Sequence, residues 1–230
     1  MIASPVSSAP ILLFDFDGTI VDSEPGIVRS WRHTFSTLSM PDLTDLEIRQ
    51  LIGPPLTWVA EQFTADPAAQ AELVRVYVER YDTIGLTEAE IYPGMFEALH
   101  ALRDGGFRLM IATAKTEHIA KSMLESFALA PLFERVVGSL RQGGRRHKHE
   151  VIGHLLNELE RDEGAVARTS LLMIGDRDHD VLGAAASGID CIGVLWGYGT
   201  DHELASAGAA CLAERPEVLV DQIRSRFTVR

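Results

Sequence analysis

Short apolar runs along the chain alternate with segments whose apolar residues recur at helical spacing. The runs are ILLFD, FRLMIAT, RVVGS, SLLMIGD and DCIGVLW, at residues 11–15, 107–113, 135–139, 170–176 and 190–196. Runs of this length and composition are typical of strands that are buried on both faces. The helical patterns cover residues 93–106, 115–129, 148–161 and 178–188. This alternation predicts an α/β fold, with a parallel sheet covered by helices on both faces.

One region interrupts the alternation. Residues 24–88 contain no strand pattern and instead predict helices at residues 26–38, 45–53, 55–63 and 68–84. An all-helical block between the first strand and the remaining strands predicts an inserted domain at 24–88, with a core made of 1–23 and 89–230. Four aromatic residues at helical spacing are expected to form the core of the insert: Trp31, Trp58, Phe63 and Tyr77.

Charge and hydropathy limit the partners of the protein. The formal net charge of −12 argues against nucleic acid and anionic membranes, because both attract basic surfaces. No apolar run reaches the ~18 residues of a membrane span. The first ten residues lack the basic start and apolar stretch of a signal peptide. We therefore expect a cytoplasmic protein, and whether it is a monomer or a homodimer is left open.

Polar residues follow the strand patterns where ligands bind in parallel α/β sheets, beyond the carboxyl ends of the strands. Asp15 and Asp17 follow the first run, and Thr113 and Ala114 end the second. Lys148 opens the helix before the fourth run, which Asp176 and Asp180 follow. We expect separate segments to bring carboxylates, a hydroxyl and an ammonium to one edge of the sheet.

The clustered acids point to a metal and to phosphate chemistry. Two neighbouring carboxylates raise each other's pKa unless a cation relieves them. Asp15 and Asp17 project to one side of an extended chain and, with Asp176, could supply oxygen ligands to Mg²⁺. Thr113, nearby backbone N–H groups and Lys148 could hold a phosphate. One carboxylate could attack phosphorus while the other serves as acid and base.

The segments DFDGT, IATAK, the single Lys148 and GDRDHD resemble, in order, the four motifs of the haloacid dehalogenase superfamily. This resemblance spans nearly the whole chain and implies a Rossmann-like core with an α-helical cap inserted after the first motif. It also implies a role for each matching residue: Asp15 as nucleophile, Asp17 as acid/base with its backbone carbonyl on Mg²⁺, Thr113 and Lys148 as phosphate ligands, Asp176 as metal ligand and Asp180 as its support.

Smaller features narrow the activity that the resemblance implies. GDRDHDVLGAAASGIDCIGVLWGYG and LIGPPL resemble the branch of phosphoglycolate phosphatases and nucleotidases. Dehalogenases lack an equivalent of Asp17, the carbon–phosphorus-cleaving branch needs a cap lysine that is absent here, and β-phosphoglucomutases carry a histidine where this chain has Ile27. In TAK, Ala114 leaves only its backbone to bind phosphate.

We therefore expect a Mg²⁺-dependent phosphomonoester hydrolase that forms an aspartyl-phosphate. Its substrate would be a small phosphorylated metabolite, either phosphoglycolate-like or a nucleoside monophosphate. The alternatives are a phosphotransferase or mutase on the same fold, a non-enzymatic phospho-acceptor switch, and a catalytically idle binding protein. His179 is interpreted as a surface or packing group, and Asp178 as exposed or as a helix N-cap. The turn at Gly53-Pro54-Pro55 is expected to face the site.

Overall fold

The computed structural model describes residues 9–140 and 144–228, and within them the chain forms a six-stranded parallel sheet in the order β5-β4-β1-β6-β7-β8. The strands are β1 (Ile11–Phe14), β4 (Arg108–Thr116), β5 (Phe133–Ser139), β6 (Leu171–Gly175), β7 (Asp190–Val194) and β8 (Cys211–Ala213). The five predicted strands are confirmed. The edge strand β8 was not predicted, because three residues are too short for a recognisable pattern.

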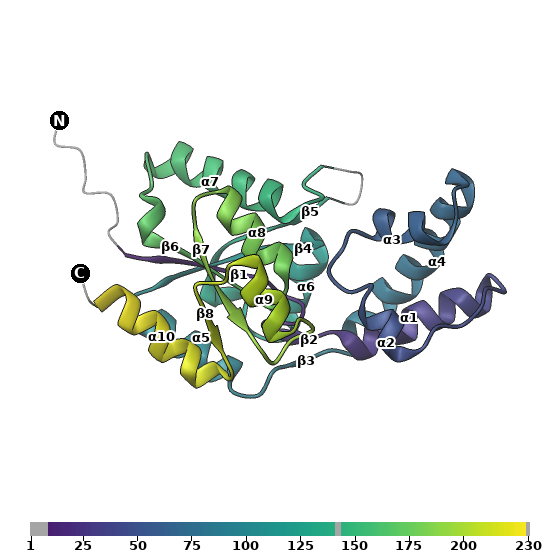
Figure 1. The fold of residues 1–230 in the computed structure, drawn as a ribbon, viewed down its shortest axis with the longest axis horizontal. Helices are drawn as coiled ribbons and strands as arrows, with labels where there is room; N and C mark the ends of the chain where they lie inside the picture. Colours follow the sequence, from purple (N-terminus) through teal and green to yellow (C-terminus); the bar gives the residue numbers. More distant parts are fainter. Residues whose placement is uncertain (1–8, 141–143, 229–230) are drawn as a thin grey trace.

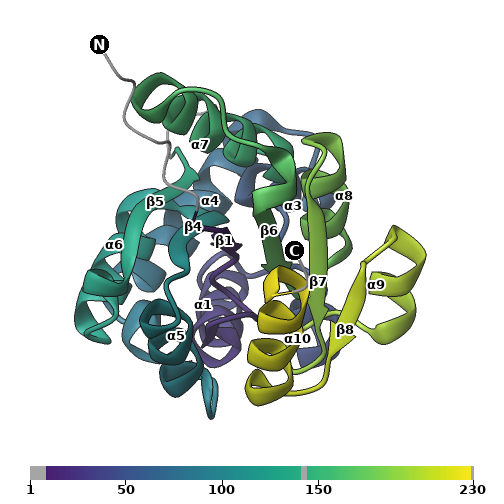
Figure 2. The ribbon, with the colours of Figure 1, turned by 90° about the vertical axis from the view of Figure 1, so that its left-hand side faces the viewer.

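Alternation along β1 separates two hydrophobic cores. Leu12 and Phe14 face the first core with α5 (Met95–Asp104), α6 (Glu117–Ser126) and α10 (Pro216–Thr228). Ile11 and Leu13 face the second core with α7 (Lys148–Glu163), α8 (Asp178–Ala186) and α9 (Asp201–Ala207). In Figure 2 the helices α7 and α8 lie above the sheet, and α5 and α10 lie below it. The predicted α/β fold with helices on both faces is therefore confirmed.

The predicted helical insert is also present. It comprises α1 (Glu24–Thr37), α2 (Asp45–Arg49), α3 (Leu56–Phe63) and α4 (Pro67–Thr83). The chain enters it through β2 (Val21–Asp22) and returns through a 3₁₀ turn (Gly85–Thr87) and β3 (Glu90–Ile91). Strands β2 and β3 pair antiparallel, and Figure 1 shows the four helices standing beyond this narrow connection. The insert thus joins the core next to the end of β1.

Aromatic packing holds the insert together. The ring of Trp31 lies 4.4 Å from that of Tyr77 and 5.6 Å from that of Phe35, and Trp31 is 1% exposed. Phe63 packs against the same cluster, with its ring centroid 6.1 Å from that of Trp31. The prediction for Trp58 is wrong, because this side chain is 46% exposed on α3. Helical spacing did not reveal which face of this short helix is buried.

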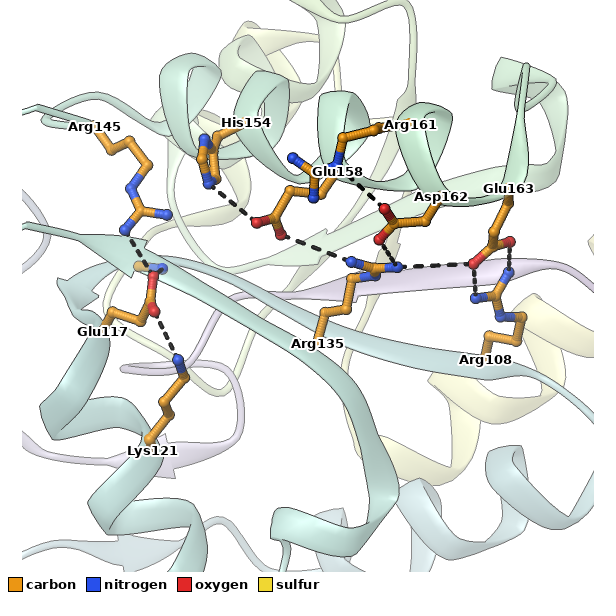
Figure 3. A network of polar contacts seen from close by, with 11 residues as sticks. Arg108, Glu117, Lys121, Arg135, Arg145, His154, Glu158, Arg161, Asp162 and Glu163 are labelled. Carbon is orange, nitrogen blue, oxygen red and sulfur yellow. Dashed lines mark hydrogen bonds and ion pairs between the residues drawn. The ribbon is translucent and has the colours of Figure 1, made fainter.

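Ion pairs tie α7 to one side of the sheet (Figure 3). Arg135 on β5 contacts Asp162 at 2.9 Å, and Arg108 on β4 contacts Glu163 at 2.6 Å. Nearer the start of α7, Arg145 pairs with Glu117 of α6 at 2.7 Å. These contacts hold the helix that begins with Lys148 in a fixed place above the sheet.

No helix in the described part of the chain is both long enough and apolar enough to cross a membrane.

We expect Trp31→Ala to lower the free energy of unfolding by about 3–5 kcal/mol, as removal of a large buried ring does. The matched control is Trp58→Ala, which should change it by no more than about 0.5 kcal/mol because the ring is exposed. Denaturant unfolding of both variants measures this. Equal losses would contradict the assignment of Trp31 to the core of the insert.

Candidate active site

The sheet order brings the predicted site residues together at one edge. Strand β1 lies between β4 and β6, so the residues that end these three strands are neighbours. The Asp15 N–H donates to the Ile174 carbonyl at 2.9 Å, which continues the β1–β6 pairing to the start of the acidic segment. Asp15, Thr113, Lys148, Asp176 and Asp180 are all buried.

Lys148 stands between two of the acids. Its Nζ lies 2.8 Å from Asp15 Oδ1, 2.7 Å from Asp180 Oδ1 and 3.0 Å from the Ala112 carbonyl oxygen. The Ala112 carbonyl accepts a hydrogen bond from the ammonium, and the two carboxylates are its ion-pair partners. Burial alone would lower the pKa of Lys148, but the charges of Asp15 and Asp180 outweigh it and raise this pKa. Lys148 therefore stays charged and fixes the Asp15 carboxylate.

The pKa values of the three buried acids Asp15, Asp176 and Asp180 are shifted in different directions. Burial would raise the pKa of Asp15, but the charge of Lys148 and hydrogen bonds from Lys148 and Thr113 lower it. Burial and the charges of Asp180 and Asp15 raise the pKa of Asp176 to about 7. Burial and the Asp15 charge also raise the pKa of Asp180, despite its contact with Lys148. Asp15 is thus ionised at neutral pH, while Asp176 is only partly ionised and forms no ion pair with a Lys or Arg within residues 9–140 and 144–228.

Close backbone approach shapes the surroundings of Asp176. Thr19 Oγ1 donates to Oδ1 at 3.2 Å, and the Tyr198 N–H donates to Oδ2 at 2.8 Å. Gly18 has φ +80°, and a Cβ built there would lie 2.2 Å from Asp176 Oδ2. Only glycine accepts both this conformation and this contact without a shift. The Gly in DFDGT is therefore required by the position of Asp176.

This donor set fits a divalent cation. Asp15, Asp176 and Asp180 offer three buried carboxylates against the single positive charge of Lys148. Hard carboxylate oxygens are the ligands that Mg²⁺ prefers. Among the described residues, the ligand atoms of Asp15, His179 and Asp180 lie within 4.8 Å of one another, although Lys148 already bridges two of these three. The predicted set of Asp15, the backbone of Asp17 and Asp176 stays a prediction.

Asp17 pairs with a different lysine, Lys115. Its Oδ1 accepts from Ser23 Oγ at 2.5 Å, and its two oxygens lie 2.9 and 3.0 Å from Lys115 Nζ. Lys115 also donates to the Tyr81 hydroxyl at 2.6 Å. Neither Lys115 nor Tyr81 was predicted as a site residue. The signal was available in part, because Lys115 is one of only three lysines and lies two residues beyond Thr113.

His179 corrects a second sequence interpretation. Instead of being a surface or packing group, it lines the pocket beside Asp15, and its buried Nε2 has no hydrogen-bond partner among the described residues. Burial alone would lower the pKa of His179, but the hydrogen bond to Asp178 and the charge of Asp180 have the larger effect and raise this pKa. Asp178 is the first residue of α8 rather than its N-cap, which is Arg177.

A pocket of about 440 Å³ lies between this edge of the sheet and the insert. The core contributes its polar wall, with Asp15, Asp17, Thr113, Ala114 and Lys115 among the lining residues. The insert contributes a mainly apolar wall with Asp82 as its charged side chain: Ile27, Trp31, Leu51, Ile52, Gly53, Pro54, Pro55, Leu56, Thr57, Val74, Tyr77, Val78, Tyr81 and Asp82. The predicted position of the Gly-Pro-Pro turn facing the site is confirmed.

The turn also touches the core directly. Arg177 Nη1 donates to the Ile52 carbonyl at 2.7 Å, while Nε of the same guanidinium donates to Glu203. Gly53 has φ +110°, and a Cβ on it would lie 2.7 Å from Cε1 of His179. The insert therefore rests on Arg177 and His179, in the segment from the end of β6 to the first turn of α8 that also carries Asp176 and Asp180.

Comparisons with known proteins agree with this geometry. The model of the family described as haloacid dehalogenase-like hydrolase matches residues 12–194. A 5'-nucleotidase of Pseudomonas aeruginosa is 41% identical over 198 residues, covering 85% of this chain and 86% of that protein. A crystal structure of a predicted phosphatase from Clostridium acetobutylicum superposes with a TM-score of 0.87 at 31% identity, covering 94% of this chain and 99% of the other.

Two further relatives carry different names. The tyrosine-protein kinase PtkA of Mycobacterium tuberculosis is 35% identical over 197 residues, covering 86% of this chain and 66% of the kinase. A phosphoglycolate phosphatase of Agrobacterium fabrum is 29% identical over 227 residues, covering 96% of this chain and 91% of that enzyme. Similarity over nearly the full chain therefore extends to proteins named for different phosphoryl substrates.

The raised pKa of Asp176 predicts how stability depends on pH. In the unfolded chain this pKa would return toward 3.8, so between that value and about 7 the folded protein binds the extra proton. The ion-free protein should therefore lose stability as the pH rises through about 7. Mg²⁺ replaces the proton, so it should raise the melting temperature more at about pH 8 than at about pH 6.

Asp176→Asn tests the origin of this dependence. The ion-free variant should melt higher than the ion-free wild type at about pH 8, because one buried like charge is gone. Mg²⁺ should then stabilise it much less. If Mg²⁺ raises the melting temperatures of wild type and variant equally, Asp176 does not contribute to the ion site.

Proposed function

We propose that this chain, which belongs to the haloacid dehalogenase-like hydrolase family, hydrolyses small phosphomonoesters with Mg²⁺ through an aspartyl-phosphate on Asp15. The chain is a phosphatase of that family, with relatives named 5'-nucleotidase and phosphoglycolate phosphatase. The proposal concerns the ion, the role of each residue and the class of substrate. The carrying observation is a buried Asp15 carboxylate, kept ionised by Lys148, at the floor of the pocket.

Asp15 is suited to attack phosphorus. Its Oδ1 accepts from the Phe16 N–H at 2.7 Å and lies 2.8 Å from Lys148 Nζ, so we assign the attack on phosphorus to Oδ2. The new bond joins Oδ2 to phosphorus, and the bond from phosphorus to the ester oxygen breaks. The leaving oxygen takes a proton from the carboxyl group of Asp17. This step yields an alcohol and an aspartyl-phosphate.

Asp17 then serves the second half of the reaction. As a carboxylate it accepts a proton from water, and the water oxygen attacks phosphorus and displaces Asp15. Inorganic phosphate leaves and the starting state returns. The position of Asp17 on the pocket wall, two residues from Asp15, supports this role.

The remaining polar groups would neutralise and orient the phosphate. Mg²⁺, held by Asp15, Asp176 and the Asp17 carbonyl, would supply positive charge to the phosphoryl oxygens. Thr113 and the Ala114 backbone line the pocket and would donate hydrogen bonds to the phosphate. Lys148 would have to reach the phosphate from among the three protein oxygens that already surround its ammonium. Asp180 supports the site by holding Lys148.

The helical insert would act as a cap domain over residues 24–88. The short β2–β3 ribbon gives it a narrow base beside Asp17, which suits a hinge. An apolar wall over the phosphate site would exclude bulk water from the pocket, apart from the one water molecule that attacks phosphorus. Residues 49–56, with the Gly-Pro-Pro turn, would form part of the surface that faces the substrate.

Within the predicted substrate class, the pocket favours a nucleoside monophosphate over phosphoglycolate. Its volume of about 440 Å³ exceeds what a two-carbon acid would fill, and the wall from the insert is apolar and aromatic. Among the described lining residues, the cations come from the core, and the insert contributes no Lys or Arg to receive a carboxylate. The relative named 5'-nucleotidase supports the same choice.

A phosphotransferase is the second candidate, and the relative named tyrosine-protein kinase favours it. The two functions share the aspartyl-phosphate and differ in its acceptor, which is water in one and a hydroxyl of another molecule in the other. Release of inorganic phosphate in proportion to alcohol product distinguishes hydrolysis from transfer.

We expect Asp15→Asn to reduce turnover by several orders of magnitude without unfolding the protein, because the nucleophile is lost. Asp17→Asn should slow turnover by about 10²–10⁴-fold and accumulate phosphate on Asp15. Kinetics with p-nitrophenyl phosphate and intact-mass spectra after acid quenching measure both. Near-normal turnover by a folded Asp15→Asn variant would refute the proposed mechanism.

We also expect kcat/KM for a nucleoside monophosphate to exceed that for phosphoglycolate by at least about tenfold. A charged hydrogen bond is worth about 1.5–3 kcal/mol. None of the insert residues that line the pocket is a Lys or Arg that could make one to the carboxylate. Val78→Arg places such a cation on the pocket wall formed by the insert. It should lower the ratio of kcat/KM for the nucleoside monophosphate to kcat/KM for phosphoglycolate. A ratio below unity in the wild type would contradict this choice of substrate.

A further inference from the structure

Lys115 is a buried lysine that the catalytic steps above do not use. Its side chain is 6% exposed, and Nζ lies 2.9 and 3.0 Å from the two oxygens of Asp17 and 2.6 Å from the Tyr81 hydroxyl. The ammonium also lies 4.7 Å from the centre of the Tyr81 ring. A desolvated lysine with these partners is held in one place.

The end of β4 brings Lys115 to this position. The pairing of β4 with β5 shifts register between Ala112 and Thr116, so Lys115 lies within an irregular stretch. Gly138 of β5 allows the close approach, since a Cβ there would lie 2.5 Å from the Lys115 carbonyl oxygen. The backbone of Lys115 is therefore fixed by the core, independently of the insert.

Its partners come from both parts of the molecule. Asp17 belongs to the loop after β1, whereas Tyr81 belongs to the last turns of α4 in the insert. Ser23, just before α1, donates to the same Asp17 oxygen at 2.5 Å. The Asp17 carboxylate is thus held by Lys115 from the core and by Ser23 at the base of the insert. Lys115 also contacts the insert through Tyr81.

We propose that Lys115 is the positioning residue for Asp17, and that its contact with Tyr81 makes this positioning depend on the insert lying over the pocket. This inference rests on the proposed function, because it assigns Asp17 the activation of water. With Tyr81 in place, Lys115 is held against both Asp17 oxygens and the carboxylate has a single orientation. Withdrawal of α4 removes one of the three oxygens that the Lys115 ammonium contacts and frees the side chain to move.

A purely structural role would have different consequences. If Lys115 only neutralised Asp17, its loss would lower stability, and the folded fraction would retain its kinetic constants. If it positions Asp17, the folded enzyme should be slow in the step that needs Asp17. That step is attack of water on the aspartyl-phosphate.

The test uses the full chain with Mg²⁺ and p-nitrophenyl phosphate, whose leaving group departs without protonation, so that dephosphorylation limits the rate. Lys115→Met should lower kcat by about 10–10²-fold, the cost typical of a misplaced catalytic group. KM should rise little or fall, and phosphate should accumulate on Asp15 in intact-mass spectra. Lys115→Arg, which can contact both Asp17 oxygens, should recover at least about a third of the loss in log kcat.

The matched control is Lys121→Met, which removes an exposed lysine of α6 and should leave the kinetic constants within about twofold. Tyr81→Phe should lower kcat by about three- to tenfold, the effect of losing one ordinary hydrogen bond, because both Asp17 contacts of Lys115 remain. The double variant Lys115→Met/Tyr81→Phe should be no slower than Lys115→Met, because both changes break one chain of contacts.

Hydrogen exchange supplies a readout that does not depend on turnover. Amides of α4 around Tyr81 should exchange faster in Tyr81→Phe and in Lys115→Met than in Lys121→Met, because the insert has lost a contact with the core. Unchanged exchange in both site variants would overturn the link to the insert.

The outcomes separate the two proposals. If the wild type neither turns over nor forms phosphate on Asp15, the proposed function fails. If the wild type does both and folded Lys115→Met keeps kcat within about twofold of Lys121→Met, the positioning role fails alone. Additive losses in the double variant, or Lys115→Arg no faster than Lys115→Met, would overturn it as well. Should Lys115→Met not fold, Lys115→Arg and Tyr81→Phe still carry the kinetic and exchange tests.

Discussion

The site depends on one buried cation, the ammonium of Lys148 between Asp15 and Asp180. A charge away from water is tolerated only when it is paired and hydrogen-bonded, and removing one partner of such a pair typically costs about 3–5 kcal/mol. The fold supplies what this requires. Helix α7 begins with Lys148, and α8 passes so close that a Cβ on Gly183 would lie 2.7 Å from the Cγ of this lysine. The chain connection from β5 through α7 to β6 is therefore also what brings Lys148 to Asp15.

The same contacts divide the acids by role. Lys148 serves Asp15 and Asp180, Lys115 serves Asp17, and Asp176 has only hydrogen bonds from Thr19 and Tyr198. Two of the three lysines of a chain with net charge −12 are thus buried in this one site. Among the described residues no lysine pairs with Asp176, so we expect the excess negative charge of the site to lie where an ion would bind.

Sequence patterns predict those parts of the molecule that depend on local order. The buried strands, the helical insert and the residues after each strand could be predicted. Burial on both faces and the spacing of motifs produce recognisable patterns within a few residues of sequence. Strands β2, β3 and β8 have two or three residues and leave none. Lys115 depends on a register shift near the end of β4, and Tyr81 depends on how α4 packs over the sheet. His179 lines the pocket on the first turn of α8, and the Gly53 turn of the insert lies against its ring. These contacts are long-range, so periodicity could not predict them.

Charge and shape come from different parts of the chain, and this division has a physical basis. The core must keep its carboxylates and lysines within hydrogen-bonding distance of each other, so a change there disturbs several buried charges at once. The pocket wall of the insert is mainly apolar, and its polar contacts with the core include Tyr81 at Lys115 and the Ile52 carbonyl at Arg177. Apolar lining can change shape at the cost of packing alone, which is usually smaller than that of an unpaired buried charge. Substrate choice can therefore vary on the insert while the reaction stays fixed in the core, provided that a contact equivalent to that of Tyr81 is kept.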